Sequence, residues 1–217
     1  MNPPPRIDLR AVTRILGGVR ALDDVSFVWD APPLLVLKGA NGAGKSTLLR
    51  VLAGVVGVDL GAVYIRGEHL ATKRAAALAH VGYLPDAFDA PPSLRVWELV
   101  ELIASLRACP APEQSLVDRL GVDAIWHEPF GGLSLGQRKR AAIVVALTGD
   151  PDILLLDEPT NGLDRAALPV LDALLRERIG AGKGVVLASH DAGFLGDVRA
   201  GVVELARGRV VGVSSRD

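Results

Sequence analysis

Residues 39–47 constrain this chain more than any other segment. They read Gly-Ala-Asn-Gly-Ala-Gly-Lys-Ser-Thr and match the phosphate-binding pattern G-x-x-x-x-G-K-[ST]. Glycines let successive backbone N–H groups turn inward around an anion, and the helix that follows adds its partial positive end. Lys45 can reach the β- and γ-phosphates, and the Ser46 hydroxyl can bind Mg²⁺. The residues predicted to hold a nucleotide are therefore Gly39, Ala40, Asn41, Gly42, Ala43, Gly44, Lys45, Ser46 and Thr47.

The sequence around this loop supports the match. Residues 34–37 are a continuous apolar run, as in a strand that is buried on both faces of a parallel sheet. After the loop, apolar residues follow a helical spacing up to Gly54, which is expected to end the helix. An ordinary glycine-rich turn would not need this order of strand, loop and helix.

A second group of polar residues follows another apolar run, residues 153–156. Asp157, Glu158 and Pro159 come directly after it. Ligands of open parallel sheets bind at the carboxyl ends of the strands. Asp157 is therefore a candidate Mg²⁺ ligand, and Glu158 is a candidate catalytic base for the water that attacks the γ-phosphate. The alternative is that Asp-Glu-Pro only ends the strand with turn residues.

His190 follows a further apolar run, residues 185–188. At the end of a strand, beside the other two motifs, it is a candidate catalytic residue that contacts the γ-phosphate. A single histidine is more often a surface or core residue, which is the alternative here. The four histidines of the chain show no metal-ligand spacing, so no zinc site is expected.

Composition narrows the class of protein. The net charge of the 217 residues is −1, so no basic field points to nucleic acid. The single cysteine excludes an internal disulfide. Apolar runs are much shorter than the roughly 20 residues of a membrane span, so a soluble chain is expected whose membrane role would need a partner. Residues 3–5, three prolines, are expected to be a frayed leader.

Apolar periodicity predicts alternating strands and helices. Predicted strands cover residues 7–12, 25–29, 34–37, 63–65, 81–84, 153–156, 185–188, 202–205 and 209–213. Predicted helices begin at Lys45, cover about 73–79, 113–120, 135–147 and 166–179, and run through 97–106 with Ser93 as N-cap. The stretch between residues 86 and 149 is thus mostly helical and interrupts two α/β halves.

Residues 133–137, Leu-Ser-Leu-Gly-Gln, resemble the signature motif of the ATP-binding cassette (ABC) ATPases, usually Leu-Ser-Gly-Gly-Gln. The order of the motifs resembles this family from about residue 6 to 213. The resemblance implies an α/β fold of the P-loop NTPase class: a mainly parallel sheet flanked by helices, an N-terminal antiparallel β portion and a helical subdomain insertion. It implies a single domain over residues 1–217. Its RecA-like core and β subdomain would cover about 6–86 and 150–213, and its helical signature subdomain about 87–149.

The resemblance also implies a mechanism. Two cassettes would dimerise head to tail around two ATP molecules, with Mg²⁺ as the metal. Each ATP would lie on the phosphate loop of one subunit and under the signature of the other, Leu133, Ser134, Leu135, Gly136 and Gln137. Ser134 and the Gly136 amide open a helix, so they offer a hydroxyl, an N–H and a positive dipole end to a phosphate. Asp164 matches the D-loop, which contacts the opposite subunit.

Three positions depart from the family pattern. Leu135 stands where the signature usually has its first glycine, which is expected to be tolerated. Asp86 stands where the family usually has a glutamine; it is either a Mg²⁺ contact, direct or through water, or a residue of a Pro-Asp turn. Leu16 stands where an aromatic residue usually stacks on adenine, so the preference for ATP over GTP is expected to be weak.

The predicted function is an ATPase (ATP and water to ADP and phosphate) that powers export through a separate integral membrane permease. Its partners would be that permease and a second cassette, identical or paralogous, with no nucleic acid. Its location would be cytoplasmic, peripheral on the inner face of the cell membrane. Within transport, a cassette for haem or cytochrome c biogenesis, or an importer cassette, is the alternative subtype.

Other functions were weighed against this one. A soluble ABC ATPase of DNA repair, chromosome handling or translation is the runner-up, and a cassette that binds ATP without turnover is a third. Residues 132–136 also fit the hydrolase pattern G-x-S-x-G, but that pattern needs a strand before Ser134 and the preceding residues do not favour one. The basic clusters 138–140 and 176–178 are expected to be solvated helix faces.

Overall fold

The computed structural model describes residues 6–191 and 193–216. The predicted leader at residues 3–5 lies outside the described part of the chain. The strands are β1 (Ile7–Leu16), β2 (Val19–Trp29), β3 (Leu34–Lys38), β4 (Leu60–Ile65), β5 (Glu68–His69), β6 (Val81–Leu84), β7 (Ile153–Asp157), β8 (Gly184–Ala188), β9 (Ala200–Ala206) and β10 (Arg209–Arg216). The α-helices are α1 (Lys45–Leu52), α2 (Arg74–Ala79), α3 (Val96–Leu106), α4 (Gln114–Arg119), α5 (Leu135–Leu147) and α6 (Ala167–Gly180), and two 3₁₀ turns cover Asp123–Ile125 and Phe130–Gly132.

The central sheet has six strands in the order β10-β9-β3-β8-β7-β6. All neighbours are parallel except the edge pair β9 and β10, which is antiparallel. β7 and β8 are buried at every residue, which explains why both read as continuous apolar runs in the sequence. This mixed sheet with flanking helices is the α/β class expected from the sequence.

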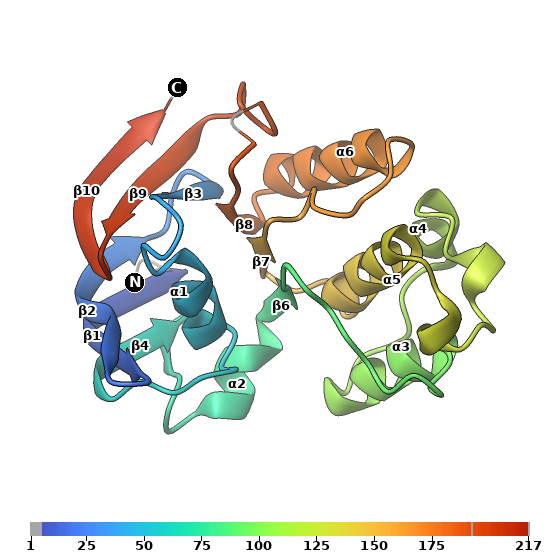
Figure 1. Cartoon of the computed structure of the whole chain (residues 1–217), viewed down its shortest axis with the longest axis horizontal. Coiled ribbons are helices and arrows are strands. Elements are labelled where there is room, and N and C mark those ends of the chain that lie inside the picture. The colour runs from blue at the N-terminus through green and yellow to red at the C-terminus, as the bar shows by residue number, and fades with distance from the viewer. Residues whose placement is uncertain (1–5, 192, 217) are drawn as a thin grey trace.

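Two hydrophobic cores cover the two faces of this sheet, because successive side chains of a strand point to opposite faces. One core contains residues of α3, α5 and α6, together with Leu34, Val36, Leu84, Leu154, Leu156, Val185, Leu187, Ala200 and Val202. The other contains residues of α1, β1 and β2, together with Leu35, Leu37, Val81, Ile153, Leu155, Val186, Ala188, Val203 and Leu205. The sheet is thereby fixed between a helical layer and an antiparallel layer (Figure 1).

The antiparallel layer is a second sheet with the order β2-β1-β4-β5. β1 and β2 form a hairpin in which Leu16 pairs with Val19 across Gly17 and Gly18. Both glycines have positive φ angles, 55° and 81°, as a two-residue turn of this kind requires. These strands extend beyond the predicted ranges 7–12 and 25–29, because pairing in the hairpin continues to the turn itself.

The helices α3, α4 and α5 lie together on one side of the molecule, between β6 and β7 in the chain (Figure 1). The prediction for residues 135–147 is confirmed to the residue by α5. The prediction of Ser93 as N-cap is wrong: α3 begins at Val96, and Arg95 is its N-cap. The Arg95 N–H donates to Glu98 Oε2 at 2.7 Å, and a β-bridge to Pro129 keeps Arg95 extended. In the part of the chain described here, no helix is long and apolar enough to cross a membrane.

Candidate nucleotide-binding site

The parallel strands β3, β6, β7 and β8 bring the predicted site together, because their carboxyl ends lie at the same edge of the sheet. Asp157 at the end of β7 pairs with Ala188 at the end of β8. A cavity of about 420 Å³ opens at this edge. It is lined by Ala21, Asn41, Gly42, Ala43, Gly44, Lys45, Ser46, Thr47, Asp86, Asp157, Glu158, Asn161 and His190.

The loop between β3 and α1 has the backbone of an anion cradle. Gly39 has φ 146°, and a Cβ atom there would lie 2.3 Å from the Leu205 carbonyl oxygen, so only glycine fits. Gly44, at φ 108°, is the N-cap of α1 and offers no side chain to the first amides of the helix. Those amides therefore remain available to a phosphate. Lys45 is 8% exposed, and its Nζ donates to the Gly39 and Ala40 carbonyls at 2.7 and 3.2 Å.

Ser46 and Asp157 form an oxygen pair beside this cradle. The Ser46 hydroxyl donates to Asp157 Oδ1 at 2.9 Å. Burial raises the pKa of the Asp157 carboxyl, and the charges of Asp86 and Glu158 raise it further, against the Ser46 hydrogen bond and the charge of Arg50. A cation would stabilise the ionised form of such a carboxylate. The hydroxyl and carboxylate oxygens fit a hard cation such as Mg²⁺.

Glu158 is held in an uncommon backbone conformation next to the cavity. Its φ is 43°, in the left-handed region that residues other than glycine seldom adopt. Its own N–H donates to the Ala188 carbonyl at 2.8 Å. Its carboxylate accepts the His190 backbone N–H at 3.1 Å, and the other carboxylate oxygen lies 3.5 Å from His190 Nε2. The predicted base and the predicted phosphate contact are thus direct neighbours.

Asp86 lines the cavity, and its carboxylate accepts a hydrogen bond from Asn161 Nδ2 at 3.1 Å. The side chain therefore faces the site, as the hypothesis of a metal contact requires. Asn161 was not predicted as a site residue. It could have been found from its position in the loop that follows Glu158, since that loop must run along the same edge of the sheet.

The signature residues lie apart from this cavity. Ser134 is the N-cap of α5: its Oγ accepts the Gln137 N–H at 3.3 Å, and Gln137 Oε1 accepts the Ser134 N–H at 2.8 Å. Ser134 is exposed, Leu135 is 70% exposed, and none of the five signature residues lines the cavity of its own chain. The residues before Ser134 form a 3₁₀ turn and not a strand, which contradicts the hydrolase pattern.

Comparison with known proteins agrees with this arrangement. Residues 22–161 match the ABC transporter family. The chain is 36% identical to the cytochrome c biogenesis ATP-binding export protein CcmA of Chelativorans sp., over 80% of this chain and 86% of the relative. This chain belongs to the ABC transporter family. It is an ATPase subunit of that family.

The relatives of this ABC ATPase include a protein named for import as well as the one named for export. The zinc import ATP-binding protein ZnuC of Halorhodospira halophila is 34% identical over 95% of this chain and 76% of the relative. Among solved structures, the ATP-binding subunit of an ABC transporter matches with a TM-score of 0.87 and 25% identity. That match covers 97% of this chain and 90% of the other. Both importers and exporters therefore share the cassette seen here.

Leu16 and Asp164 of the ABC ATPase stand outside the cavity. Leu16, at the end of β1, is 37% exposed and does not line it, whereas Ala21 on β2 does. Asp164 is engaged within its own chain. Its carboxylate is paired with Arg140 on α5, with Arg140 Nε at 2.8 Å, and accepts the Ala166 and Ala167 amides at 3.1 and 3.0 Å.

The prediction that residues 138–140 form a solvated face is wrong. Lys139 is 4% exposed, and its Nζ donates to the carbonyls of Pro85, Asp86 and Glu158. The guanidinium of Arg138 lies over the Phe130 ring, 5.6 Å from its centroid. In the sequence, Lys139 stands between two arginines and was therefore grouped with them as a surface charge. It lies three, four and seven residues before Ala142, Ile143 and Ala146, all buried, and that helical spacing indicates the core face.

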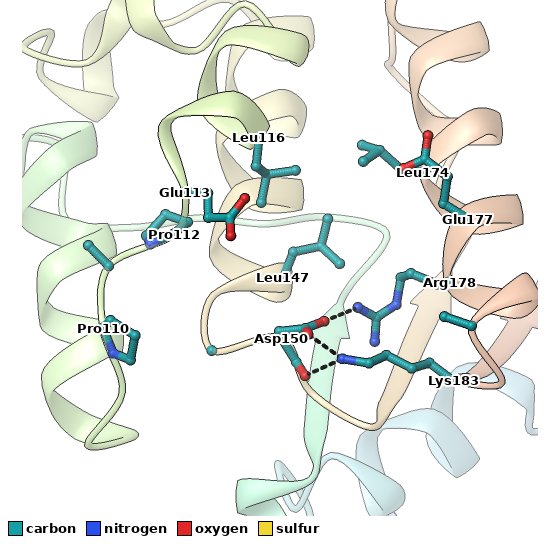
Figure 2. A pocket seen from close by; sticks show the side chains of 13 residues that line it. Pro110, Pro112, Glu113, Leu116, Leu147, Asp150, Leu174, Glu177, Arg178 and Lys183 are labelled. Carbon is teal, nitrogen blue, oxygen red and sulfur yellow. Dashed lines mark hydrogen bonds and ion pairs between the residues drawn. The ribbon is translucent and has the colours of Figure 1, made fainter.

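The prediction fails in the same way for Arg178, which is 9% exposed. It lines a second cavity, of about 480 Å³, between α6 and the segment around α4 (Figure 2). Arg178 Nη1 donates to Asp150 Oδ1 at 2.9 Å, and Lys183 is also paired with Asp150. This cavity shares no residue with the nucleotide-binding cavity.

Proposed function

We propose that this ABC ATPase is one of two cassettes that close on ATP and Mg²⁺ and power export through a separate membrane permease. The observation that carries the proposal is the separation of the two motifs. The phosphate loop lines a cavity to which the signature of the same chain contributes nothing. An exposed helix start with a hydroxyl and a free dipole end is suited to a phosphate held by a second chain. That second cassette is identical or paralogous.

The geometry of the site residues supports a role for each of the main predicted groups. The loop amides and Lys45 would bind the phosphates, and Lys45 would exchange its present carbonyl partners for phosphate oxygens. Glu158 would accept a proton from the attacking water at its carboxylate. His190, whose backbone orients that carboxylate, would place its ring at the γ-phosphate. Ser134 and Gly136 would close the site from the other chain, and Asp164 would contact that chain beside them.

Mg²⁺ would be held by Ser46 and Asp157, with Asp86 as a direct or water-mediated contact. Within residues 6–191 and 193–216, no three histidine, cysteine, aspartate or glutamate side chains gather as a metal site. The remaining ligands would then be phosphate oxygens and water, the usual arrangement for Mg²⁺ with a nucleotide. An ion bound there would neutralise the negative charge that develops on the phosphates.

A groove between the helical segment and the core supports docking of a permease. It has a volume of about 760 Å³ and is lined by residues of α2 and β6, by Ala53 after α1, and by Ile103, Leu106, Arg107 and Ala108 at and beyond the end of α3. Leu106 on its wall is 73% exposed, and Tyr83 lines its floor. An exposed leucine beside a groove is suited to an apolar helix of a partner. Burial raises the pKa of Tyr83, and the charges of Asp157 and Asp86 raise it further, against the hydrogen bond and charge of Arg50.

The groove between the helical segment and the core supports a description of the chain in two parts. These are a helical signature subdomain of about 87–149 and a core of about 6–86 and 150–213 into which it is inserted. Docking would hold the chain on the inner face of the cell membrane. Export is supported by the cytochrome c biogenesis export protein, which the chain matches over most of both lengths. Leu16 would give adenine an apolar contact in place of stacking.

The test uses paired variants of α3, in cells that produce the chain together with a candidate permease, which would be a multi-span membrane protein from a neighbouring reading frame. Leu106→Asp should move the ATPase from the membrane fraction to the supernatant and leave purified ATPase activity intact. Leu102→Asp is the matched control, because Leu102 is 48% exposed on the same helix and does not line the groove. Membrane binding that both variants retain would contradict docking here. Uptake of cargo into inside-out vesicles on addition of ATP would support export.

A further inference from the structure

Lys139 is a buried cation, and two of its three hydrogen bonds end on residues that line the nucleotide cavity, Asp86 and Glu158. Its Nζ donates to the carbonyl oxygens of Pro85 at 3.2 Å, Asp86 at 3.0 Å and Glu158 at 3.2 Å. An ammonium group has three donors, so its hydrogen-bonding capacity is used in full. These hydrogen bonds connect the signature helix α5 to the segment after β6 and to the loop after β7.

Burying the ammonium group of Lys139 lowers the stability of the fold in a way that burying an apolar side chain would not. Moving an ammonium group out of water is unfavourable unless it is well paired, and an apolar residue of similar volume is often neutral or stabilising in such a position. Burial lowers the pKa of Lys139, while the charges of Asp86, Asp157 and Glu158 oppose that shift. The carboxylates of the site therefore favour the charged form of Lys139.

The contact to Glu158 bears on the catalytic geometry. A residue with a side chain is strained in a sparsely populated backbone region and stays there only when its surroundings hold it. The N–H of Glu158 is fixed by the Ala188 carbonyl, and its carbonyl is fixed by Lys139. With both ends of the residue held, the carboxylate is directed towards His190.

The contact to Asp86 acts on the opposite wall. β6 ends at Leu84, and α3 begins only at Val96, so Asp86 lies in a segment without helix or strand. Lys139 holds the carbonyl oxygens of two successive residues, Pro85 and Asp86, while Asn161 holds the Asp86 side chain.

We propose that Lys139 is a positioning residue for ATP hydrolysis, which fixes Glu158 and Asp86 relative to the signature helix. The inference rests on the proposed role of Glu158. Lys139 follows Ser134 by five residues, about 7.5 Å along the helix axis. A shift of α5 that seats Ser134 on the nucleotide of a second chain would therefore also move the base and Asp86, so that closure and catalytic alignment are coupled.

The test is Lys139→Met in the full chain, which keeps length and volume and removes the charge and the donors. We expect kcat to fall about 10–100-fold while the dissociation constant of a fluorescent ATP analogue stays within about twofold, because Lys45 and the loop are untouched. Lys139→Gln, which keeps two N–H donors on a shorter side chain, should recover part of the loss in kcat. It also replaces the first variant if Lys139→Met does not fold.

Arg178→Met is the matched control, since Arg178 is also a buried cation and lies outside the site (Figure 2). It should lower the melting temperature and leave kcat per folded molecule unchanged. The inference is overturned if Lys139→Met keeps kcat within about threefold of the parent. It is also overturned if Lys139→Met weakens binding of the ATP analogue by as large a factor as it lowers kcat.

A double-mutant cycle separates this inference from the proposed function. If Lys139 acts through Glu158, Lys139→Met should change turnover little once Glu158→Gln is present. Full additivity of the two losses would contradict the inference and leave the role of Glu158 standing. Parental turnover in Glu158→Gln alone would instead contradict the proposed function.

Discussion

Replacing Glu158 by glutamine separates the chemical role of this residue from its structural one. Glutamine has the same length, and its carbonyl oxygen can still accept the His190 N–H that Glu158 accepts at 3.1 Å. The Ala188 and Lys139 contacts involve only the backbone of Glu158, so they remain. What is lost is a group that can take a proton from water at neutral pH.

The magnitude follows from the contribution of a positioned base, typically a factor of about 10²–10⁴ in rate. A tenfold change corresponds to about 1.4 kcal/mol, so the barrier should rise by roughly 2.7–5.4 kcal/mol. Stability should change little, because the replacement preserves volume and the hydrogen bond. Nucleotide affinity should also stay close to that of the parent, since the loop and Lys45 bind the phosphates.

Three measurements decide the outcome: phosphate release at saturating ATP, titration with a fluorescent nucleotide, and light scattering after size exclusion. We expect slow release, unchanged binding and a dimer that persists with ATP and dissociates with ADP. Glu177→Gln is the control, because Glu177 is exposed and pairs with Arg119 far from the site. Phosphate release at the parental rate in Glu158→Gln, or monomers alone with ATP, would refute the reasoning.

Four further outcomes are expected. Lys45→Ala should weaken nucleotide binding at least about tenfold in the same titration, and unchanged affinity would rule out its phosphate contact. Asp157→Asn should raise the melting temperature of the nucleotide-free protein at pH 8, by about 2–4 °C per kcal/mol. Burial raises the pKa of Asp157, so the ionised carboxylate destabilises the folded parent protein above that pKa. The increase in melting temperature on replacement by asparagine should therefore become smaller as the pH is lowered towards 4. An increase that became larger at low pH would contradict this reasoning. Asp86→Asn should increase the Mg²⁺ concentration for half-maximal turnover, and an unchanged Mg²⁺ curve would leave Asp86 as a turn residue. GTP should be hydrolysed at a rate comparable with ATP because Leu16 offers no stacking; a strong preference for ATP would count against that idea.

Local patterns were sufficient for much of the site. The phosphate loop needs glycine at Gly39 because a Cβ would meet the Leu205 carbonyl, and its helix begins at Lys45 as predicted. The buried strand β8 is apolar throughout and β7 is apolar up to its last residue, Asp157, so the polar residues at these strand ends are visible in the sequence. Parallel pairing then requires these ends to meet, so Ser46, Asp157 and Glu158 line one cavity together with Lys45 and His190. Gly39 and Ala40 of the predicted loop do not line it.

Long-range contacts were not visible in the same way. Ser93 is a good N-cap residue, yet the bridge between Arg95 and Pro129, 34 positions apart, delays the start of α3 by two residues. Lys139 and Arg178 look like surface charges in sequence, because their partners are carbonyls and carboxylates of distant segments. A charged side chain can be buried only where such partners converge.

The sequence by itself determined the family, the order of strands and helices, and the chemical types at the nucleotide site. These depend on short-range periodicity and on motifs whose residues are close neighbours in the chain. Only the tertiary structure decided which charges are buried, that Asp86 faces Asn161 in the cavity, and that the signature lies outside the cavity of its own chain. Those properties depend on how far-separated backbone carbonyls, amides and side chains meet in space, and packing of the two cores around the central sheet fixes that.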